Sequence, residues 1–317
     1  MHSYGAHWKL AATPGSNARF KDALTFLEYC RDLGAGGVQV TITSKDFGFA
    51  KGIRSTAEAC GMYFEGQLSM PKDEAGLQQF ELDVRLAKEA GASVIRTAFL
   101  SGRRYETFDS AEAFRQFKER SWKSLLLCEP ILKRHRMRLA IENHKDWFAS
   151  EQVDLLRRAQ SEFIGACVDI GNNLALLEDP LELVNALAPF AFSTHIKDMA
   201  VQEYEEGFLL SEVPLGKGFL DLKQLIGILR KANPAIRLNL EMITRDPLKI
   251  PCLTAKYWLP MGDVRAERLA RILDLVKKNR STRPLPRTTG LAQEEQLKFE
   301  DANVRESIDY AHRELSA

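Results

Sequence analysis

The amino-acid sequence predicts an α/β fold, and within that class a (β/α)8 TIM barrel followed by a C-terminal helical extension. Short β-branched apolar runs alternate with longer amphipathic stretches along most of the chain, and strands separated by helices pair in parallel. Eight such units occur, which is the number that closes this barrel. A doubly wound open sheet usually carries a GxGxxG motif after its first strand, whereas "AATPGSN" follows the first apolar run here.

The predicted strands are short apolar runs, and a helical stretch is expected after each one. They cover residues 4–10, 37–42, 62–68, 93–99, 138–143, 165–170, 191–196 and 237–243. The clearest helical patterns lie at 17–33 and at about 111–135. The stretch "TRDPLKIPCLTAKYWLPMGD" separates the last strand from its helix. A loop of that length on the active-site side is typical either of a lid or substrate wall or of a packed surface loop.

The length and composition fit one catalytic domain with a tail. The chain has 317 residues, of which 45% are hydrophobic and 27% are charged, and α/β barrels commonly exceed 250 residues as a single domain. The stretch "STRPLPRTTG" is typical of a linker. We therefore predict a barrel over 1–280 and a linker with a helical tail over 281–317, the helix covering 291–314. The tail either packs on the barrel, contacts a second subunit or is exposed.

Charge and cysteine content narrow the choice of partners and compartment. Forty-four Lys and Arg residues face 43 Asp and Glu residues, so no overall field favours nucleic acid or an anionic membrane. The sequence has no apolar run long enough for a signal peptide or a membrane span. Its five cysteines are scattered without a CxxC pair, which favours reduced thiols in the cytoplasm. The expected partner is a small-molecule substrate, and self-association stays open.

Polar side chains end four consecutive predicted strands. They are Glu142, Asp169, His195 and Glu241, separated by 27, 26 and 46 residues. A lone Asp at a strand end is usually a helix cap, and a lone His is usually a core residue. Three carboxylates placed at one level of a barrel would repel one another unless a cation lay between them. The pattern therefore predicts one divalent metal ion, Mn, Mg, Co or Zn, with manganese slightly favoured.

The motifs around these residues resemble a known superfamily. "AIENHK", "CVDIGNN", "STHIKD" and "LNLEMI" are similar to the strand-end motifs of the xylose isomerase-like TIM barrels, which are grouped with the second family of apurinic endonucleases. The resemblance covers residues 5–280 and implies that the four strand-end residues bind one divalent metal. By the same resemblance to ketose epimerases of this group, Glu142 and Glu241 act as the acid/base pair.

The sequence departs from two branches of that superfamily. The endonucleases use several additional His and Asp ligands, whereas this chain has only six histidines, and Asn172 stands where many relatives place a His. In addition, "HIKD" supplies Lys197 and Asp198 where ketose epimerases often have an Arg and an acid. DNA repair is therefore disfavoured, and the substrate stays open.

Further polar residues near the strand ends are candidate substrate contacts. Lys197 and His144 each lie two residues beyond a predicted ligand, and Arg245 opens the long loop. For Lys197 the alternative is an ion pair with Asp198 or another acid, and for Arg245 it is an ion pair with Asp246 or another loop acid. The remaining candidates are Asn172, His7, Trp8, Glu65 and Arg96.

The predicted site supports three hypotheses of function. The first is a metal-dependent isomerase or epimerase of a sugar or keto-sugar, acting through an enediolate. The second is a metal-dependent lyase or decarboxylase of a sugar-derived keto acid, which the cations Lys197 and Arg245 favour. The third is a barrel subunit without catalysis. Deuterium exchange would favour the first, release of carbon dioxide the second, and absence of metal binding the third.

Overall fold

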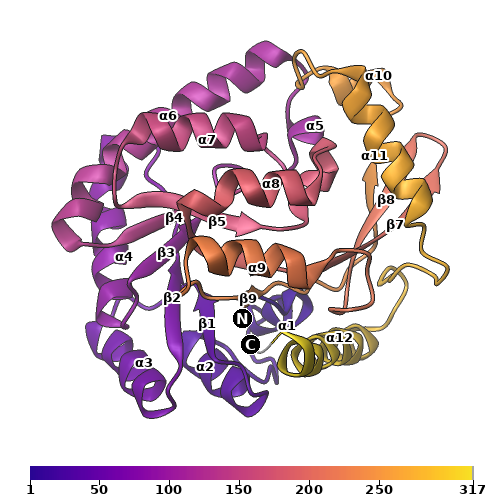
Figure 1. Cartoon of the computed structure of the whole chain (residues 1–317). Helices are drawn as coiled ribbons and strands as arrows, with labels where there is room; N and C mark the ends of the chain where they lie inside the picture. The colour runs from indigo at the N-terminus through magenta and orange to yellow at the C-terminus, as the bar shows by residue number, and fades with distance from the viewer. Residues whose placement is uncertain (316–317) are drawn as a thin grey trace.

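The computed structural model describes residues 1–315 and contains a barrel of parallel strands surrounded by helices (Figure 1). The barrel sheet has seven strands in the order β1-β2-β3-β4-β5-β6-β9. Their bounds are Gly37–Val40, Tyr63–Gln67, Val94–Thr97, Arg138–Glu142, Ile164–Asp169, Ala191–Ile196 and Asn239–Leu240. The predicted α/β class and TIM-barrel fold are confirmed.

Helices follow most of the strands and cover the outside of the barrel (Figure 1). The helix α6, Ala111–His135, has the predicted bounds because Ser110 accepts a hydrogen bond from the amide of Ala113 and Arg136 ends it in the left-handed conformation. The other α-helices of the barrel region are α1 Gly5–Ala11, α2 Ala23–Asp32, α3 Phe47–Ala59, α4 Leu77–Glu89, α5 Arg104–Thr107, α7 Ala149–Ala159, α8 Pro180–Leu187, α9 Leu222–Ala232, α10 Ala255–Trp258 and α11 Ala266–Lys278.

The first three residues lie between the two edge strands of the barrel sheet. The amide of His2 donates to the carbonyl of Leu240 at 2.8 Å, and the amide of Gln39 donates to the carbonyl of Met1 at 2.9 Å. These bonds join β9 to β1 through an extended segment, so the place of the eighth strand is filled.

The predicted first strand at 4–10 is wrong. The chain leaves the barrel at Tyr4, which has a positive φ of 79°, and residues Gly5–Ala11 form the helix α1. Ala, Lys and Leu within "GAHWKLA" are good helix formers. The extended segment lies at residues 1–3 instead, immediately before the stretch that the apolar pattern favoured.

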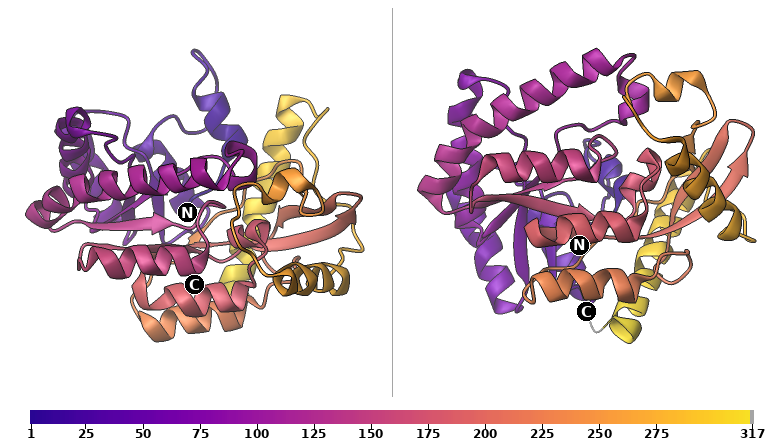
Figure 2. Two further views of the ribbon diagram at one scale, coloured as in Figure 1. Left: turned by 90° about the horizontal axis from the view of Figure 1, so that it is seen from above. Right: turned by 45° about the horizontal axis from the view of Figure 1, so that its top comes forward.

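The expected direct passage from the strand at 191–196 to a helix is also wrong. A hairpin of β7, Asp198–Tyr204, and β8, Gly207–Val213, intervenes before α9. These strands pair with β10, Leu248–Ile250, in a three-stranded antiparallel sheet beside the barrel, seen next to α11 in Figure 2. A two-residue turn at Glu205 and Glu206, followed by Gly207 with a φ of 149°, joins the two strands and is typical of such a hairpin.

The long loop after β9 is partly ordered by that hairpin. It contains β10 and the short helix α10. The hydroxyl of Tyr257 donates to the carbonyl of Ala175 at 2.9 Å, and Arg104 donates to the carbonyl of Pro260 at 3.0 Å. The loop therefore packs against the segments that follow β3 and β5 at their carboxyl ends.

The predicted tail helix is present as α12, Gln293–Glu314. It packs against α1 beside the barrel (Figure 1) and buries Val304 and Ile308 in the main core. Of the alternatives for the tail, packing on the barrel is the one observed. The domain boundary at 280 stays a prediction, and the last two residues of the predicted tail lie outside the described residues.

Two further sequence-based expectations concern the chain as a whole. Within residues 1–315, no helix is long and apolar enough to cross a membrane. All five cysteines are free thiols.

Candidate metal centre

The four strand-end residues predicted as ligands converge at the carboxyl end of the barrel. Asp169 and His195 are register partners on β5 and β6, Glu142 is the last residue of β4, and Glu241 follows β9 directly. One potential ligand atom from each lies within 4.8 Å of all the others. All four side chains are buried, so the fold brings three acids and one imidazole together away from water.

The imidazole of His195 faces the three carboxylates. Its Nδ1 atom lies 3.4 Å from Glu142, 3.7 Å from Asp169 and 3.5 Å from Glu241. Within the described residues this buried nitrogen has no regular hydrogen-bond partner. A buried nitrogen left in this position fits a metal ligand, because buried polar atoms are otherwise paired.

Gln39 fixes which nitrogen of His195 carries the proton. The side-chain Nε2 of Gln39 donates to Glu65 at 2.9 Å and to Ser193 at 3.1 Å. Its Oε1 atom therefore faces Nε2 of His195, at 2.7 Å, and accepts a hydrogen bond from the N–H at that position. A neutral imidazole protonated at Nε2 presents a lone pair at Nδ1, which is the form that binds metals.

Hydrogen bonds from backbone amides also fix the orientation of the Asp169 carboxylate. Its Oδ1 atom accepts hydrogen bonds from the amides of Gly171 and Asn172 at 2.9 and 2.8 Å, while Oδ2 faces His195 and Lys197. Burial raises the pKa of Asp169, and Lys197 opposes that rise. Hard carboxylate oxygens with one imidazole fit Mn, Mg, Co or Zn, so the residues fit a divalent ion without selecting one.

Basic side chains surround the cluster. Arg96 forms an ion pair with Glu142, and Lys197 pairs with Glu241 and, at 2.8 Å, with Asp169. Burial alone would raise the pKa of Glu241, but Lys197 and His195 outweigh it and hold this pKa well below its usual range. Both predicted acid/base glutamates are thus paired with cations.

A second group of charges lies beside Lys197. The carboxylate of Glu212 is 2.7 Å from Arg245 and 3.7 Å from Lys197. Asp198 instead accepts hydrogen bonds from backbone amides, including Gly216 and Gly218 at 2.9 Å. Lys197 therefore pairs with acids other than Asp198, and Arg245 pairs with Glu212.

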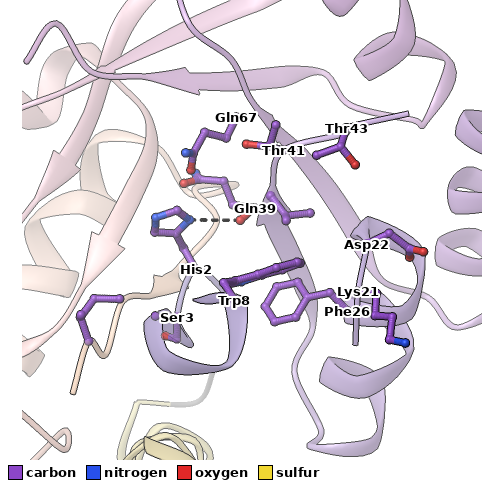
Figure 3. A pocket seen from close by; sticks show the side chains of 13 residues that line it. His2, Ser3, Trp8, Lys21, Asp22, Phe26, Gln39, Thr41, Thr43 and Gln67 are labelled. Carbon is purple, nitrogen blue, oxygen red and sulfur yellow. Dashed lines mark hydrogen bonds between the residues drawn. The ribbon is translucent and has the colours of Figure 1, made fainter. Parts of the chain in front are cut away.

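Two cavities open next to the cluster, at the ends of β1 to β3. The first, of about 350 Å³, is lined by His2, Trp8, Phe26, Thr41 and Gln67 among others. Figure 3 shows the indole of Trp8 beside the ring of Phe26, with His2 bonded to Gln39. The second, of about 430 Å³, shares Thr41 and Gln67 with the first and adds Arg96, His144 and Lys45. His2, which stacks on His195, lines the first cavity, and Arg96, which pairs with Glu142, lines the second. A small molecule in either space would therefore lie close to the ligand cluster.

Two predicted substrate contacts have other surroundings than expected. His7 lies on α1, not on a barrel strand, and its Nδ1 atom is 2.8 Å from the buried carboxylate of Glu300 on α12. Glu65 accepts hydrogen bonds from Gln39, Ser193 and Asn239 inside the barrel. Burial raises the pKa of Glu65, against these hydrogen bonds. Neither residue lines the two cavities.

The other predicted contacts lie close to the cluster. Arg96 and His144 line the second cavity, and Trp8 lines the first. The ring of His144 is held by the carbonyl of Leu100 at 2.9 Å. The side-chain Nδ2 of Asn172 donates to Oε1 of Glu142 at 3.0 Å.

Sequence reasoning missed three residues that contact the site. His2 stacks on His195 with ring centroids 4.7 Å apart and lies 3.7 Å from Glu241. Gln39 orients His195, and Glu212 holds Lys197 and Arg245. Gln39 is a polar residue inside the apolar run "GVQV", and this could have indicated that its side chain has a specific partner inside the barrel. Glu212 could have been found only by predicting the hairpin that carries it.

The barrel and this cluster define a protein of the xylose isomerase-like class. Residues 27–260 match the family described as xylose isomerase-like TIM barrel, and the chain belongs to this family.

Individual relatives differ in their chemistry. Over 192 residues the chain is 29% identical to 3-oxo-isoapionate decarboxylase of Pectobacterium atrosepticum, and the match spans 60% of each chain. A structure of D-psicose 3-epimerase in the presence of D-fructose is 14% identical, with a TM-score of 0.61 over 92% of this chain and 93% of that one. A Mycobacterium smegmatis family protein in complex with magnesium is 15% identical, with a TM-score of 0.57 over 89% and 97%. At these identities the two structures establish the fold alone.

Proposed function

We propose that the protein is a metal-dependent decarboxylase of a sugar-derived 3-oxo acid. The main support for this proposal is the balance of charges in the site. Around the cluster, within the described residues, four carboxylates lie beside four basic side chains, three of which form ion pairs with those carboxylates. The acids are Glu142, Asp169, Glu212 and Glu241, and the cations are Arg96, Lys145, Lys197 and Arg245. A divalent ion would add two positive charges to this balanced set, so the loaded site would favour an anionic substrate.

The ion pairs also bear on the type of reaction. Proton abstraction from carbon needs a free carboxylate as base, whereas Glu142 is paired with Arg96 and Glu241 with Lys197. Loss of carbon dioxide needs no base. The 29% identity to a 3-oxo acid decarboxylase supports the same choice.

The proposed reaction breaks the bond between C1 and C2 of the 3-oxo acid. The electron pair of that bond moves toward the ketone oxygen at C3, carbon dioxide leaves, and C2 takes a proton. A divalent ion held by Glu142, Asp169, His195 and Glu241 would supply positive charge to stabilise that oxygen. The buried ammonium group of Lys145, at the same end of the barrel, is the available proton donor, because its pKa is lowered by burial, whereas Asp169, Glu212 and Glu241 raise that of Lys197 against the effect of burial. Burial of all these groups keeps bulk water from the carbanion-like carbon.

Epimerisation is the second candidate, and one specific observation favours it. Oxygen atoms of Glu142 and Glu241 lie 3.4 and 3.5 Å from the same atom, Nδ1 of His195. Two glutamates that flank one point could exchange protons with opposite faces of a bound ketose.

A single experiment separates the two candidates. Purified protein with Mn²⁺ or Mg²⁺ is incubated in D₂O with a panel of 3-oxo sugar acids and a panel of ketoses. We expect carbon dioxide equimolar with consumed 3-oxo acid, and loss of that activity on chelation. Deuterium in recovered ketoses without carbon dioxide from any acid would refute decarboxylation in favour of epimerisation. Neither reaction with either panel would refute both.

A further inference from the structure

Lys145 is a buried cation close to the proposed metal centre. It lies three residues after Glu142, at the carboxyl end of β4, and its side chain is 4% exposed. Its backbone has a positive φ of 65°, and its carbonyl accepts a hydrogen bond from Arg104 at 3.0 Å. The ammonium group donates to Oδ1 of Asn172.

Lys145 differs from the other buried lysine in its partners. Within residues 1–315 the buried lysines are Lys145 and Lys197. Lys197 has three carboxylates within 3.7 Å, whereas Lys145 has no carboxylate within ion-pair distance among the described residues. A buried ammonium without an anion is costly, so an anion bound beside Lys145 would lower that cost.

Within residues 1–315, the one side-chain acceptor of Lys145 is shared with a like charge. Lys197 also donates to Oδ1 of Asn172, at 3.3 Å. Asn172 cannot turn away, because its Nδ2 atom donates to Glu142 at 3.0 Å and to the carbonyl of Asn143 at 3.2 Å. Two ammonium groups therefore converge on one neutral oxygen, an arrangement that repels until an anion joins it.

Further positive charges lie around Lys145. Burial, followed by the positive charges of Lys197 and Arg245, lowers the pKa of Lys145 to about 7, and Asp169 and Glu212 oppose that shift. The neighbouring residue His144 and the cation Arg96 line the 430 Å³ cavity beside the metal cluster. A substrate in that cavity would meet Arg96 directly, and Lys145 follows the lining residue His144 in the chain.

We infer that Lys145, with Lys197, forms a subsite for the carboxylate of the substrate. This inference rests on the proposed function and names the group that its substrate must carry. A carboxylate at this place supplies a charged acceptor to both ammonium groups and reduces their mutual repulsion. When carbon dioxide leaves, the ammonium of Lys145 lies next to the C2 carbon that takes the proton.

The test measures binding and needs no turnover. Titration calorimetry in the presence of Mn²⁺ compares D-gluconate, a sugar carboxylate, with D-glucitol, its neutral polyol counterpart. We expect the native protein to prefer gluconate and Lys145→Met to weaken gluconate binding about 10- to 100-fold, the effect of losing one charge-assisted hydrogen bond. Binding of glucitol and of Mn²⁺ alone should stay within about 2-fold in the same variant.

Lys223→Met is the matched control. Lys223 is exposed, pairs with Glu314 and lines neither cavity, so this variant removes the same charge without touching the subsite. It should keep the preference for gluconate. No preference in the native protein, an unchanged preference in Lys145→Met, or equal weakening of both ligands would overturn the inference. If gluconate binding depends on Lys145 but no acid is decarboxylated, the subsite stands and the proposed function fails.

Discussion

The Nε2 atom of His195 lies 2.7 Å from Oε1 of Gln39, and this contact determines what the other face of the imidazole can do. Gln39 donates through its Nε2 to Glu65 and Ser193, so its oxygen is the acceptor for His195. The lone pair of Nδ1 is thereby directed at Glu142, Asp169 and Glu241. Gln39, which is not itself a predicted ligand, therefore determines that His195 presents the lone pair of Nδ1 to a metal ion.

Replacing Gln39 with Leu should therefore weaken metal binding without removing a ligand. Loss of such an orienting partner typically lowers metal affinity about 10- to 100-fold. Titration with Mn²⁺, followed by the loss of its free-ion EPR signal, measures the affinity directly. Gln67→Leu is the control, because Gln67 lies on the next strand and lines both cavities without touching His195. Equal affinities for native protein and Gln39→Leu would contradict the orienting role.

Metal binding should also stabilise the fold. An ion at 100 times its dissociation constant raises the free energy of unfolding by about 2.7 kcal/mol, which corresponds to a melting temperature higher by several degrees. Asp169→Asn should lose most of this increase, because Asp169 Oδ2 is one of the clustered ligand atoms. Differential scanning calorimetry with EDTA and then with Mn²⁺ provides the measurement. An increase of the same size in the variant would exclude Asp169 as a ligand.

Lys145→Met should make the metal-free protein more stable near pH 6. The pKa of Lys145 is lowered to about 7 in the folded protein, against about 10.4 in an unfolded chain. As the pH rises, Lys145 therefore loses its proton at a lower pH in the folded protein than in the unfolded chain. The cost of burying the ammonium is fully present below about pH 7 and disappears above about pH 10.

We expect Lys145→Met to gain about 1–4 kcal/mol at pH 6 and almost nothing at pH 10. Urea denaturation at the two pH values measures the difference. Lys45→Met, at a half-exposed ion pair, should change stability by less than about 1 kcal/mol at pH 6. A variant that is less stable than the native protein at pH 6 would show that Lys145 serves the fold and not the ligand.

Glu300 should connect the tail helix to the site. Its buried carboxylate accepts hydrogen bonds from the amides of Ala6 and His7 at 2.8 and 3.0 Å and from the ring of His7, and Trp8 follows in the wall of the first cavity. Glu300→Gln leaves one of these donors facing an amide NH₂ group and should cost about 1–3 kcal/mol.

Backbone amides of residues 5–11 should also exchange their hydrogens faster in Glu300→Gln than in the native protein. Glu306→Gln is the control on the same helix, because Glu306 is exposed and pairs with Lys217. It should change stability by less than about 1 kcal/mol. Unchanged exchange over residues 5–11 in Glu300→Gln would show that the tail does not hold α1 in place.

Much of the fold followed from the sequence because apolar runs ending in polar residues mark barrel strands. The bounds of α6 and of the strand 191–196 were predicted as observed. The prediction at 4–10 was wrong because a short apolar stretch fits a strand or a helix equally well, and the positive φ of Tyr4 that decides between them leaves no periodic signal.

The candidate site was predictable where each residue ended its own strand. The cluster of Glu142, Asp169, His195 and Glu241 follows from topology, since parallel strands end at one face. Glu212 was not predictable, because it reaches the site from a hairpin outside the barrel repeat. The partners of Lys145 depend on the rotation of Asn172, which no sequence pattern records.

The central claim is that Glu142, Asp169, His195 and Glu241 bind one divalent ion. A crystal soaked in Mn²⁺ and measured for anomalous scattering tests it most directly. We predict one strong peak bounded by Nδ1 of His195 and an oxygen of each of the three carboxylates, at about 2.0–2.3 Å. A map with no peak there, and with the ammonium of Lys197 still between Asp169 and Glu241, would contradict the claim.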